Sequence, residues 1–158
     1  MLSIRQVYKQ EDLLILGKMK MELMRYHLEY AAQLGIDDKE LLQYTLDQAL
    51  STTGERDNYL FYADDEPIGM AQVEEQISYV DNLPILFVHG IYIKADARNQ
   101  SIGGIFLRYI CSKYKKRIEC ECWYNIPASV LYQKAGFRPI MTRYTLPLSS
   151  RFYGSDQN

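Results

Sequence analysis

One stretch in the middle of the chain constrains the fold more than any other: an apolar run that leads through a glycine-containing turn into a helix. The run ILFVHGIYI follows Pro84 and has the composition of a strand buried on both faces. The turn ARNQSIGG comes next, and a helix is expected over Ile105–Lys115. A helix that begins directly after such a turn leaves several backbone N–H groups unpaired, which favours an anion there. The sequence predicts an anion-binding turn over Arg98–Gly104; a ligand-free strand-to-helix turn is the alternative.

The residues of this turn favour a pyrophosphate. Its glycines allow the backbone to approach a ligand closely, and Arg98 adds a permanent positive charge with bidentate reach. The segment lacks the GK[ST] of a Walker loop and the GxGxxG of a dinucleotide-binding turn. Neither of those phosphate-binding classes is therefore expected.

The remaining pattern predicts a single mixed α/β domain over residues 1–148 and a tail over 149–158. Before the central run we expect a strand over 2–8, a helix from QEDLL to Gly35, a second helix from Asp37 or Asp38 through Leu50, and strands over Asn58–Ala63 and Ile68–Ser78 joined by the turn DDEPIG. After the turn and its helix we expect a strand over Arg117–Trp123, a helix over Ala128–Ala135 and a last strand over Arg138–Leu146.

Composition excludes several classes of partner. A net charge of −2, from 18 basic and 20 acidic residues, gives no attraction to nucleic acid or to an anionic membrane. The first residues have no apolar signal core and no stretch approaches a membrane span, so a cytoplasmic protein is expected. Three cysteines (Cys111, Cys120 and Cys122) and two histidines (His27 and His89) suggest neither a disulfide framework nor a structural metal.

Two motifs resemble those of the GNAT family of N-acetyltransferases. Residues 91–103, IYIKADARNQSIG, are similar to its acetyl-CoA motif L-Y-V-x-P-x-x-R-x-x-G-x-G, with Ala95 in place of proline and Ser101 in place of the first glycine. Serine lacks the free positive-φ range of glycine, so the turn must use an αR-like backbone at Ser101 or carry strain. The Ser101 hydroxyl is also able to donate to a phosphate oxygen.

The second motif, residues 125–137, matches the family's pattern N-x-x-A-x-x-L-Y-x-K-x-G-F at every fixed position. The resemblance covers Leu86–Phe137 closely and implies the GNAT fold, a central mixed and mostly antiparallel sheet flanked by helices. It further implies a transferase that moves an acetyl group from acetyl-CoA to a primary amine. The cofactor-binding residues that it implies are Ile91, Tyr92, Ile93, Arg98, Asn99, Gln100, Ser101, Ile102, Gly103, Gly104, Asn125, Tyr132 and Lys134.

Tyr132 and His89 are the expected catalytic residues. The resemblance places Tyr132 as general acid to the leaving thiolate, since a phenol with a pKa of about 10 is protonated at neutral pH; the alternative is a tyrosine that only packs its helix. His89 precedes the expected cofactor strand, and an imidazole pKa of about 6.5 suits a general base. A strand histidine bonded to a neighbour is its alternative, and Glu74 or Glu75 acting through water is another route.

The acceptor is less constrained. A small amine is the leading expectation, with Tyr26, Tyr30 and Glu74 as candidate substrate residues; a protein or peptide N-terminus and a non-catalytic acyl-CoA-binding domain are the alternatives. No cysteine is placed as an obvious nucleophile, so direct attack in a ternary complex is expected. Dimers are common in the family, so a homodimer is an alternative to a monomer for this chain.

Glu119 and Glu121 fall where the family usually has apolar residues. Either these carboxylates face the cleft, or the following loop is one residue shorter and Cys120 and Cys122 take the apolar sites. We favour the shorter loop.

Overall fold

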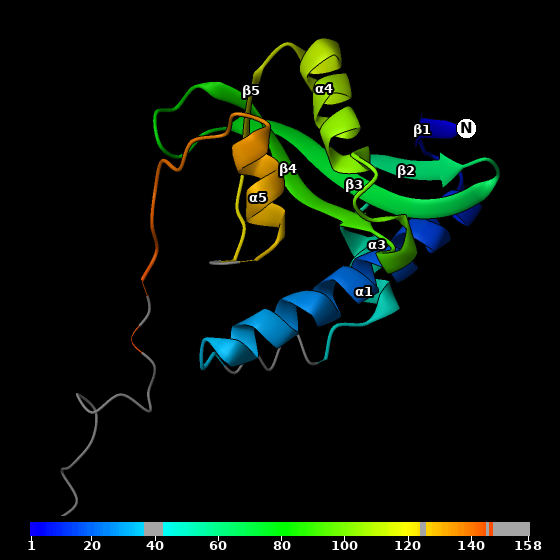
Figure 1. Ribbon diagram of the computed structural model, residues 1–158, viewed down its shortest axis with the longest axis horizontal. Helices are drawn as coiled ribbons and strands as arrows, with labels where there is room; N and C mark the ends of the chain where they lie inside the picture. Colours follow the sequence, from blue (N-terminus) through cyan, green and yellow to red (C-terminus); the bar gives the residue numbers. More distant parts are fainter. Residues whose placement is uncertain (37–42, 124–125, 145, 147–158) are drawn as a thin grey trace, which may run out of the picture.

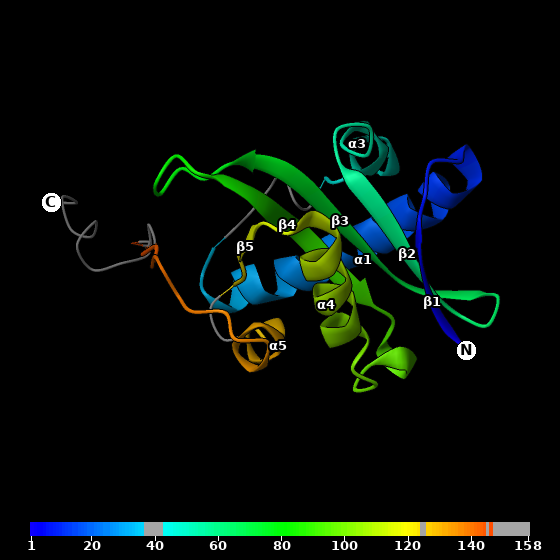
Figure 2. The same ribbon diagram turned by 90° about the horizontal axis from the view of Figure 1, so that it is seen from above.

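The computed structural model describes residues 1–36, 43–123, 126–144 and 146, and these form a five-stranded sheet with helices on both faces. The strands follow the order β1-β2-β3-β4-β5, with β5 parallel to β4 and the other neighbours antiparallel. Helices α1 and α3 lie on one face, and α4 and α5 on the other (Figures 1 and 2). The expected mixed α/β fold is confirmed. The elements are β1 (Leu2–Gln6), α1 (Gln10–Gln33), α3 (Leu46–Ser51), β2 (Asp57–Ala63), β3 (Glu66–Ile77), β4 (Pro84–Ile93), the short 3₁₀ helix η1 (Ala95–Ala97), α4 (Ile102–Tyr114), β5 (Arg117–Cys120) and α5 (Ala128–Lys134).

The core has two parts because successive side chains of a strand point to opposite faces of the sheet. On the α1 face, Leu60 and Met70 of the sheet pack with Leu16, Met19 and Leu23 of α1. The other face buries a larger cluster under α4 and α5, which includes Tyr59, Phe61, Val73, Leu86, Val88, Phe106, Ile110 and Tyr132. The sheet is therefore covered on both sides.

The first helix ends as predicted, and the second does not follow the prediction. Gly35 has φ +72°, and the N–H groups of Gly35 and Ile36 bond to the carbonyls of Ala32 and Ala31, which is a Schellman ending. A continuous helix through residues 43–45 was a wrong expectation, because Thr45 is the N-cap of α3 in a capping box with Gln48. The start expected at Asp37 or Asp38 lies outside the described residues.

The central strand β4 pairs along its whole length with β3 but only along its first half with β5. The β4–β5 ladder runs from Ile85 opposite Arg117 to Val88 opposite Cys120 and stops there. A register shift on the β3 side leaves His89 without a Cα partner, as in a β-bulge. The expectation of burial on both faces thus holds for the first half alone, since residues 89–93 are only partly buried. β5 also ends three residues before the expected Trp123.

The strand expected over Arg138–Leu146 is not found in residues 138–144 and 146. Ile140, Met141 and Tyr144 are exposed, so these side chains are not buried against the sheet. Pro139 in addition has no N–H to donate to a ladder. Without such burial, a strand over these residues gains no stability from the core.

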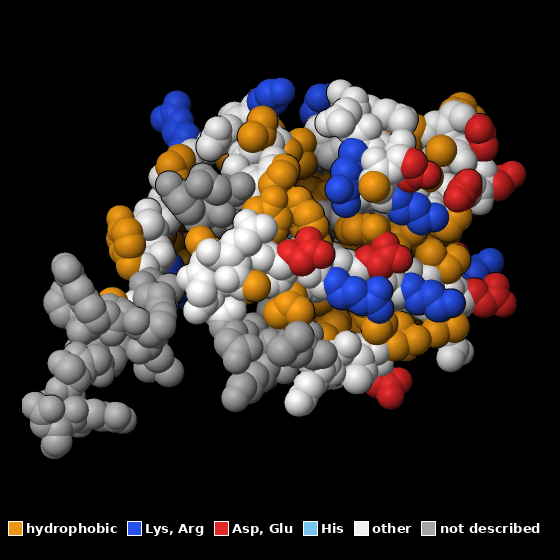
Figure 3. Space-filling view, turned by 60° about the horizontal axis from the view of Figure 1, so that its bottom comes forward, with side chains coloured by type: hydrophobic (Ala, Val, Ile, Leu, Met, Phe, Trp, Pro, Cys, Tyr) orange, Lys and Arg blue, Asp and Glu red, His pale blue; other side chains and the backbone are white. Residues whose placement is uncertain are grey.

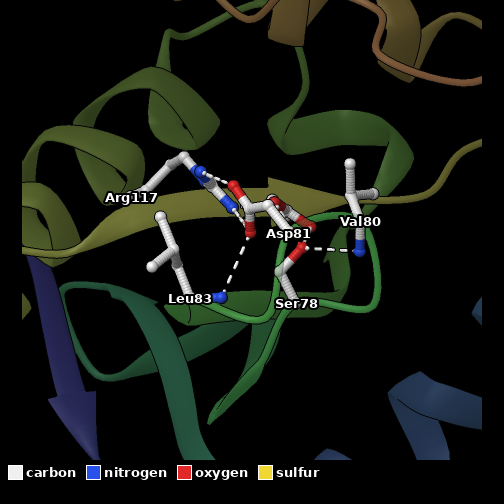
Figure 4. Close-up of polar contacts among 6 residues, drawn as sticks. Ser78, Val80, Asp81, Leu83 and Arg117 are labelled. Atoms are coloured by element: carbon white, nitrogen blue, oxygen red, sulfur yellow. Dashed lines mark hydrogen bonds and ion pairs between the residues drawn. The ribbon is translucent and has the colours of Figure 1, made fainter.

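A polar clamp ties β5 to the turn between β3 and β4 (Figure 4). Arg117 donates two hydrogen bonds to Asp81, at 2.6 and 2.8 Å, and Ser78 donates to both carboxylate oxygens of Glu119 at 3.0 and 3.1 Å. The Tyr79 hydroxyl donates to Glu121 at 3.5 Å. Both glutamates therefore face the turn.

The two cysteines of this segment differ from each other. Cys120 packs against the core cluster, as the shorter-loop interpretation requires. Cys122 is exposed, so its expected apolar site was wrong.

Candidate active site

Beyond Val88 and Cys120, β4 has an edge without a neighbouring strand in the described parts of the chain. The Lys94 N–H donates to the Ile68 carbonyl on β3 at 2.9 Å. Because backbone groups alternate in direction along a strand, those of Ile93 and Ile91 point to the opposite, open edge. On that edge the Ile93 carbonyl accepts from Arg98 Nε at 2.9 Å. The N–H and C=O of Ile91 therefore face the opening between β4 and β5.

The turn after β4 has a strained backbone. Asn99 has φ +62° and Ser101 has φ +60° and ψ +15°, both in the left-handed region. The sequence left two alternatives for Ser101, an αR-like backbone or a strained one, and the structure shows the strained backbone. The Ser101 side chain makes no capping bond to α4, which begins at Ile102, three residues earlier than expected.

The amides of this turn are a candidate site for an anion. The first backbone bond into α4 runs from the Ile105 N–H to the Ser101 carbonyl at 2.9 Å. Among the described residues, no acceptor is found for the N–H groups of 99–104. These six consecutive amides lie at the positive end of the α4 dipole. This donor set fits a pyrophosphate, and the open edge at Ile91 fits the amide-bearing arm of coenzyme A.

The two glycines of the turn have different surroundings. A Cβ atom at Gly104 would meet nothing closer than Arg108 Nη1 at 3.8 Å, so this side of the helix start is open to a ligand. A Cβ atom at Gly103 would lie 2.7 Å from Cδ2 of Leu131 on α5. Gly103, predicted to bind the cofactor, also has a packing role that the sequence did not indicate.

Tyr132 lies on α5 and is almost fully buried in the cluster under α4. Its hydroxyl lies beside the thiol of Cys120, the last residue of β5, where β4 and β5 separate. Burial raises the pKa of the Tyr132 phenol above its ordinary value, and burial raises the pKa of the Cys120 thiol to about 12. Both groups keep their protons at neutral pH.

His89 and Glu74, named separately from the sequence, form a pair in the structure. Nε2 of His89 lies 2.7 Å from Oε2 of Glu74. Burial lowers the pKa of His89; Glu74 acts against this, while the positive charges of Arg56 and Lys20 act with it. The imidazole is therefore neutral at pH 7, the state that a base needs.

The sequence did not reveal a group of buried polar side chains beside this pair. Lys20 of α1 is 6% exposed and donates to the Thr52 hydroxyl. Burial and the nearby Arg56 lower its pKa to about 8. Gln72, 1% exposed, is held between Arg56 at 3.3 Å and Asn58 at 2.8 Å. The sequence feature that could have indicated this buried group is Lys20 itself, a lysine between Leu16 and Leu23 on the apolar stripe of α1.

The candidate acceptor tyrosines lie on α1, beside Arg98 of the phosphate turn, residues 98–104. The hydroxyls of Tyr26 and Tyr30 are 3.4 Å apart, and the Arg98 guanidinium lies 5.6 Å from the centre of the Tyr26 ring. Burial raises the pKa of Tyr26 to about 12. Tyr92, predicted beside the cofactor, donates to Glu22 of α1. α1 thus borders both the turn and β4.

Two of the predicted cofactor residues stay predictions. Asn125 lies outside the described residues. Lys134 is exposed as the last residue of α5. The aromatic pair His27 and Trp123, whose ring centres are 6.5 Å apart, joins α1 to the segment after β5 and was not predicted.

A comparison with protein families identifies the family to which a chain with this arrangement belongs. The sequence pattern of the family described as "Acetyltransferase (GNAT) domain" matches residues 55–139, more than half of the chain. The chain belongs to the GNAT acetyltransferase family. The matched span includes β2 to α5, and so the open edge, the phosphate turn and Tyr132. This GNAT protein is accordingly an N-acetyltransferase.

Solved structures share the fold of this acetyltransferase at low sequence identity. A Pyrococcus furiosus protein is 19% identical with a TM-score of 0.73, over 93% of this chain and 99% of its own. A mutant Bacillus halodurans protein is 14% identical with a TM-score of 0.72, over 92% and 99%. The aminoglycoside N-acetyltransferase AAC(6')-Iy, solved in complex with CoA, is 16% identical with a TM-score of 0.64, over 92% and 96%. No curated protein matches the chain.

Two further observations on this GNAT protein concern membrane-spanning helices and metal sites. None of the described helices is both long and apolar enough to cross a bilayer. Within residues 1–36, 43–123, 126–144 and 146, no three His, Cys, Asp or Glu side chains gather as a metal site requires.

Proposed function

We propose that this chain transfers the acetyl group of acetyl-CoA to the primary amine of a small molecule by direct attack. The observation that carries the proposal is the separation of β4 from β5 after Val88 and Cys120. The separation leaves the backbone of Ile91 free toward an opening whose far end meets the unpaired amides of residues 99–104. Acetyl-CoA, when bound, supplies an acyl group activated as a thioester.

The residues around the opening have complementary chemistry. The Ile91 N–H is directed at the open edge, where a donor would polarise a thioester carbonyl. Tyr132 keeps its proton to high pH and is able to donate it to the leaving thiolate. Neutral His89 is able to take a proton from the incoming amine. The raised pKa of the Cys120 thiol argues against a covalent acetyl-cysteine and for direct attack.

A small amine is the acceptor class that the observations favour. Three of the structural neighbours are structures of aminoglycoside acetyltransferases, at 16%, 14% and 19% identity. Acidic and basic side chains alternate over the face that Figure 3 turns toward the viewer, with hydrophobic side chains between them. A mixed surface of this kind suits a polar organic molecule better than a highly charged polymer.

Amine-dependent release of free thiol from acetyl-CoA tests the proposal. A panel of polyamines, aminoglycosides, aromatic amines and short peptides should include small amines that raise thiol release well above the amine-free rate. Mass spectrometry of the product should show a single added acetyl group. Release with peptide N-termini alone would contradict the small-molecule acceptor, and release with none of the panel would contradict the proposal.

A further inference from the structure

Acetylation of an amine at neutral pH must discharge a proton. The acceptor enters as an ammonium ion with three protons on nitrogen and leaves as an amide with one. The C–N bond forms and the thioester C–S bond breaks. One proton goes to the sulfur of coenzyme A, and the other must reach the solvent in every turnover. A base in a partly buried site therefore needs a way to pass its proton outward.

Glu74 lies where such a transfer is required. Its Oε2 atom is 2.7 Å from Nε2 of His89. The same side chain lines a hollow of about 270 Å³ together with Glu55, Asp57 and Glu75. The hollow lies at the start of β2, where the ladder with β3 ends at Asp57 opposite Val73. The exposed fraction rises from 20% for the His89 side chain to 33% for the Glu74 side chain. Glu74 thus connects the imidazole with solvent.

The pair also fixes which nitrogen of His89 is free. A carboxylate only accepts hydrogen bonds, so the nitrogen that faces Glu74 carries the proton. Nε2 is therefore the N–H, and Nδ1 keeps the lone pair that takes a proton from the amine. The other charged groups that act on His89 are Arg56, before β2, and Lys20, on α1. Both are positive, so they disfavour a lasting imidazolium and favour transfer of its Nε2 proton to Glu74.

We propose that Glu74 is the proton exit of this enzyme, taking the Nε2 proton of His89 and releasing it into the acidic hollow. The inference rests on the proposed role of His89 as base. The step is balanced: Nδ1 gains the amine proton, Nε2 gives its proton to Glu74, and water in the hollow receives it. Between turnovers, proton exchange of both ring nitrogens with water returns His89 to its Nε2–H form.

Glu75 provides a matched control. It is the next residue of β3 and lines the same hollow, but its Oε1 atom pairs with Lys116 at 2.8 Å instead of with His89. A change of Glu75→Gln removes the same charge from the hollow and leaves the His89 contact in place. The loss of one negative charge from the hollow would affect both variants alike. The proton-transfer route from His89 would be lost only in Glu74→Gln.

The test compares kcat in wild type, Glu74→Gln and Glu75→Gln at increasing concentrations of a small buffer such as imidazole. We expect Glu74→Gln to lower kcat about 100-fold in dilute buffer. Added buffer should restore kcat while the KM for acetyl-CoA stays unchanged. Wild type and Glu75→Gln should show no buffer dependence. Full kcat of Glu74→Gln in dilute buffer, or equal buffer dependence of both variants, overturns the proposal.

A second readout does not depend on turnover. Nitrogen-15 NMR of the two imidazoles, assigned with His89→Gln, reports the tautomer of His89. The Nε2–H form is expected in wild type and a mixture in Glu74→Gln; an Nδ1–H form in wild type overturns the proposal. Absence of turnover with every amine counts against the proposed function, whereas turnover with the wrong tautomer counts against Glu74 alone.

Discussion

Leu131 packs so closely on Gly103 that a Cβ atom there would lie 2.7 Å from its Cδ2 atom. This contact joins the two sequence motifs in space, because Gly103 belongs to the phosphate turn and Leu131 precedes Tyr132. The first turn of α4 therefore supports α5. The phosphate turn, where we propose that the cofactor binds, and the proposed general acid therefore belong to one structural unit.

Gly103→Ala and Gly104→Ala should have opposite effects. An added methyl at Gly103 must displace Leu131, and overpacking of this kind costs about 1–3 kcal/mol. Alanine regains about 1 kcal/mol of helix propensity, so we expect a net loss of about 1 kcal/mol in the free energy of unfolding. At Gly104 the methyl meets open space, so stability should rise while coenzyme A binds more weakly. Denaturant unfolding measures the stability of each variant, and calorimetric titration measures its affinity for coenzyme A. A rise in stability for Gly103→Ala would contradict the packing role.

Ser101→Gly should stabilise the protein. Ser101 holds φ +60° and its side chain makes no capping bond, so glycine relieves strain without losing a hydrogen bond. We expect a gain of about 1 kcal/mol in the free energy of unfolding. Affinity for coenzyme A should stay the same or rise. A large loss of affinity would mean that the serine hydroxyl itself holds a phosphate oxygen.

Tyr132→Phe should lower kcat about 100- to 1,000-fold with little change in stability, because one hydroxyl is lost from a packed ring. The raised pKa of Tyr132 implies that the wild-type phenol is not the group that limits activity up to at least pH 9. The pH dependence of kcat, with exposed Tyr144→Phe as control, checks both statements. Unchanged kcat across pH would remove Tyr132 from the chemistry.

Lys20→Met should stabilise the protein at pH 7. In the folded chain the Lys20 pKa is lowered from 10.5 to about 8, so between these values the unfolded chain binds more protons and wild-type stability rises with pH. Methionine keeps most of the volume and removes the buried charge. We expect a gain of about 1–2 kcal/mol at pH 7, after allowing for solvent screening, that shrinks as the pH rises above 8. The loss of a positive neighbour should also raise the pKa of His89. Urea unfolding from pH 7 to 10 checks the first effect, and an unchanged pH slope would contradict it.

The sequence predicted elements of the fold correctly where the pattern was local. The strand over the apolar run 85–93, the hairpin around Asp64, the ending of α1 at Gly35 and the two family motifs were all readable, because each depends on neighbouring residues. Elements whose extent depends on distant contacts were misjudged. β5 ends where its pairing with β4 ends, and residues 138–144 find no surface on which to form a strand.

The candidate site divides in the same way. The phosphate turn and Tyr132 were readable because their motifs are contiguous. The pairing of His89 with Glu74 was not, because it depends on the bulge that leaves His89 without a partner on β3. Lys20, Arg56 and Gln72 come from three separate segments and meet only in the folded chain.

The central claim is that coenzyme A binds along the open edge of β4 with its pyrophosphate on the amides of residues 99–104. The most direct test is thermal unfolding of the protein with coenzyme A and, separately, with pantetheine, which lacks the pyrophosphate. At 100 times its Kd, coenzyme A should stabilise the fold by about 2.7 kcal/mol, and pantetheine at the same concentration should stabilise it far less. An unchanged melting temperature with coenzyme A would contradict the account.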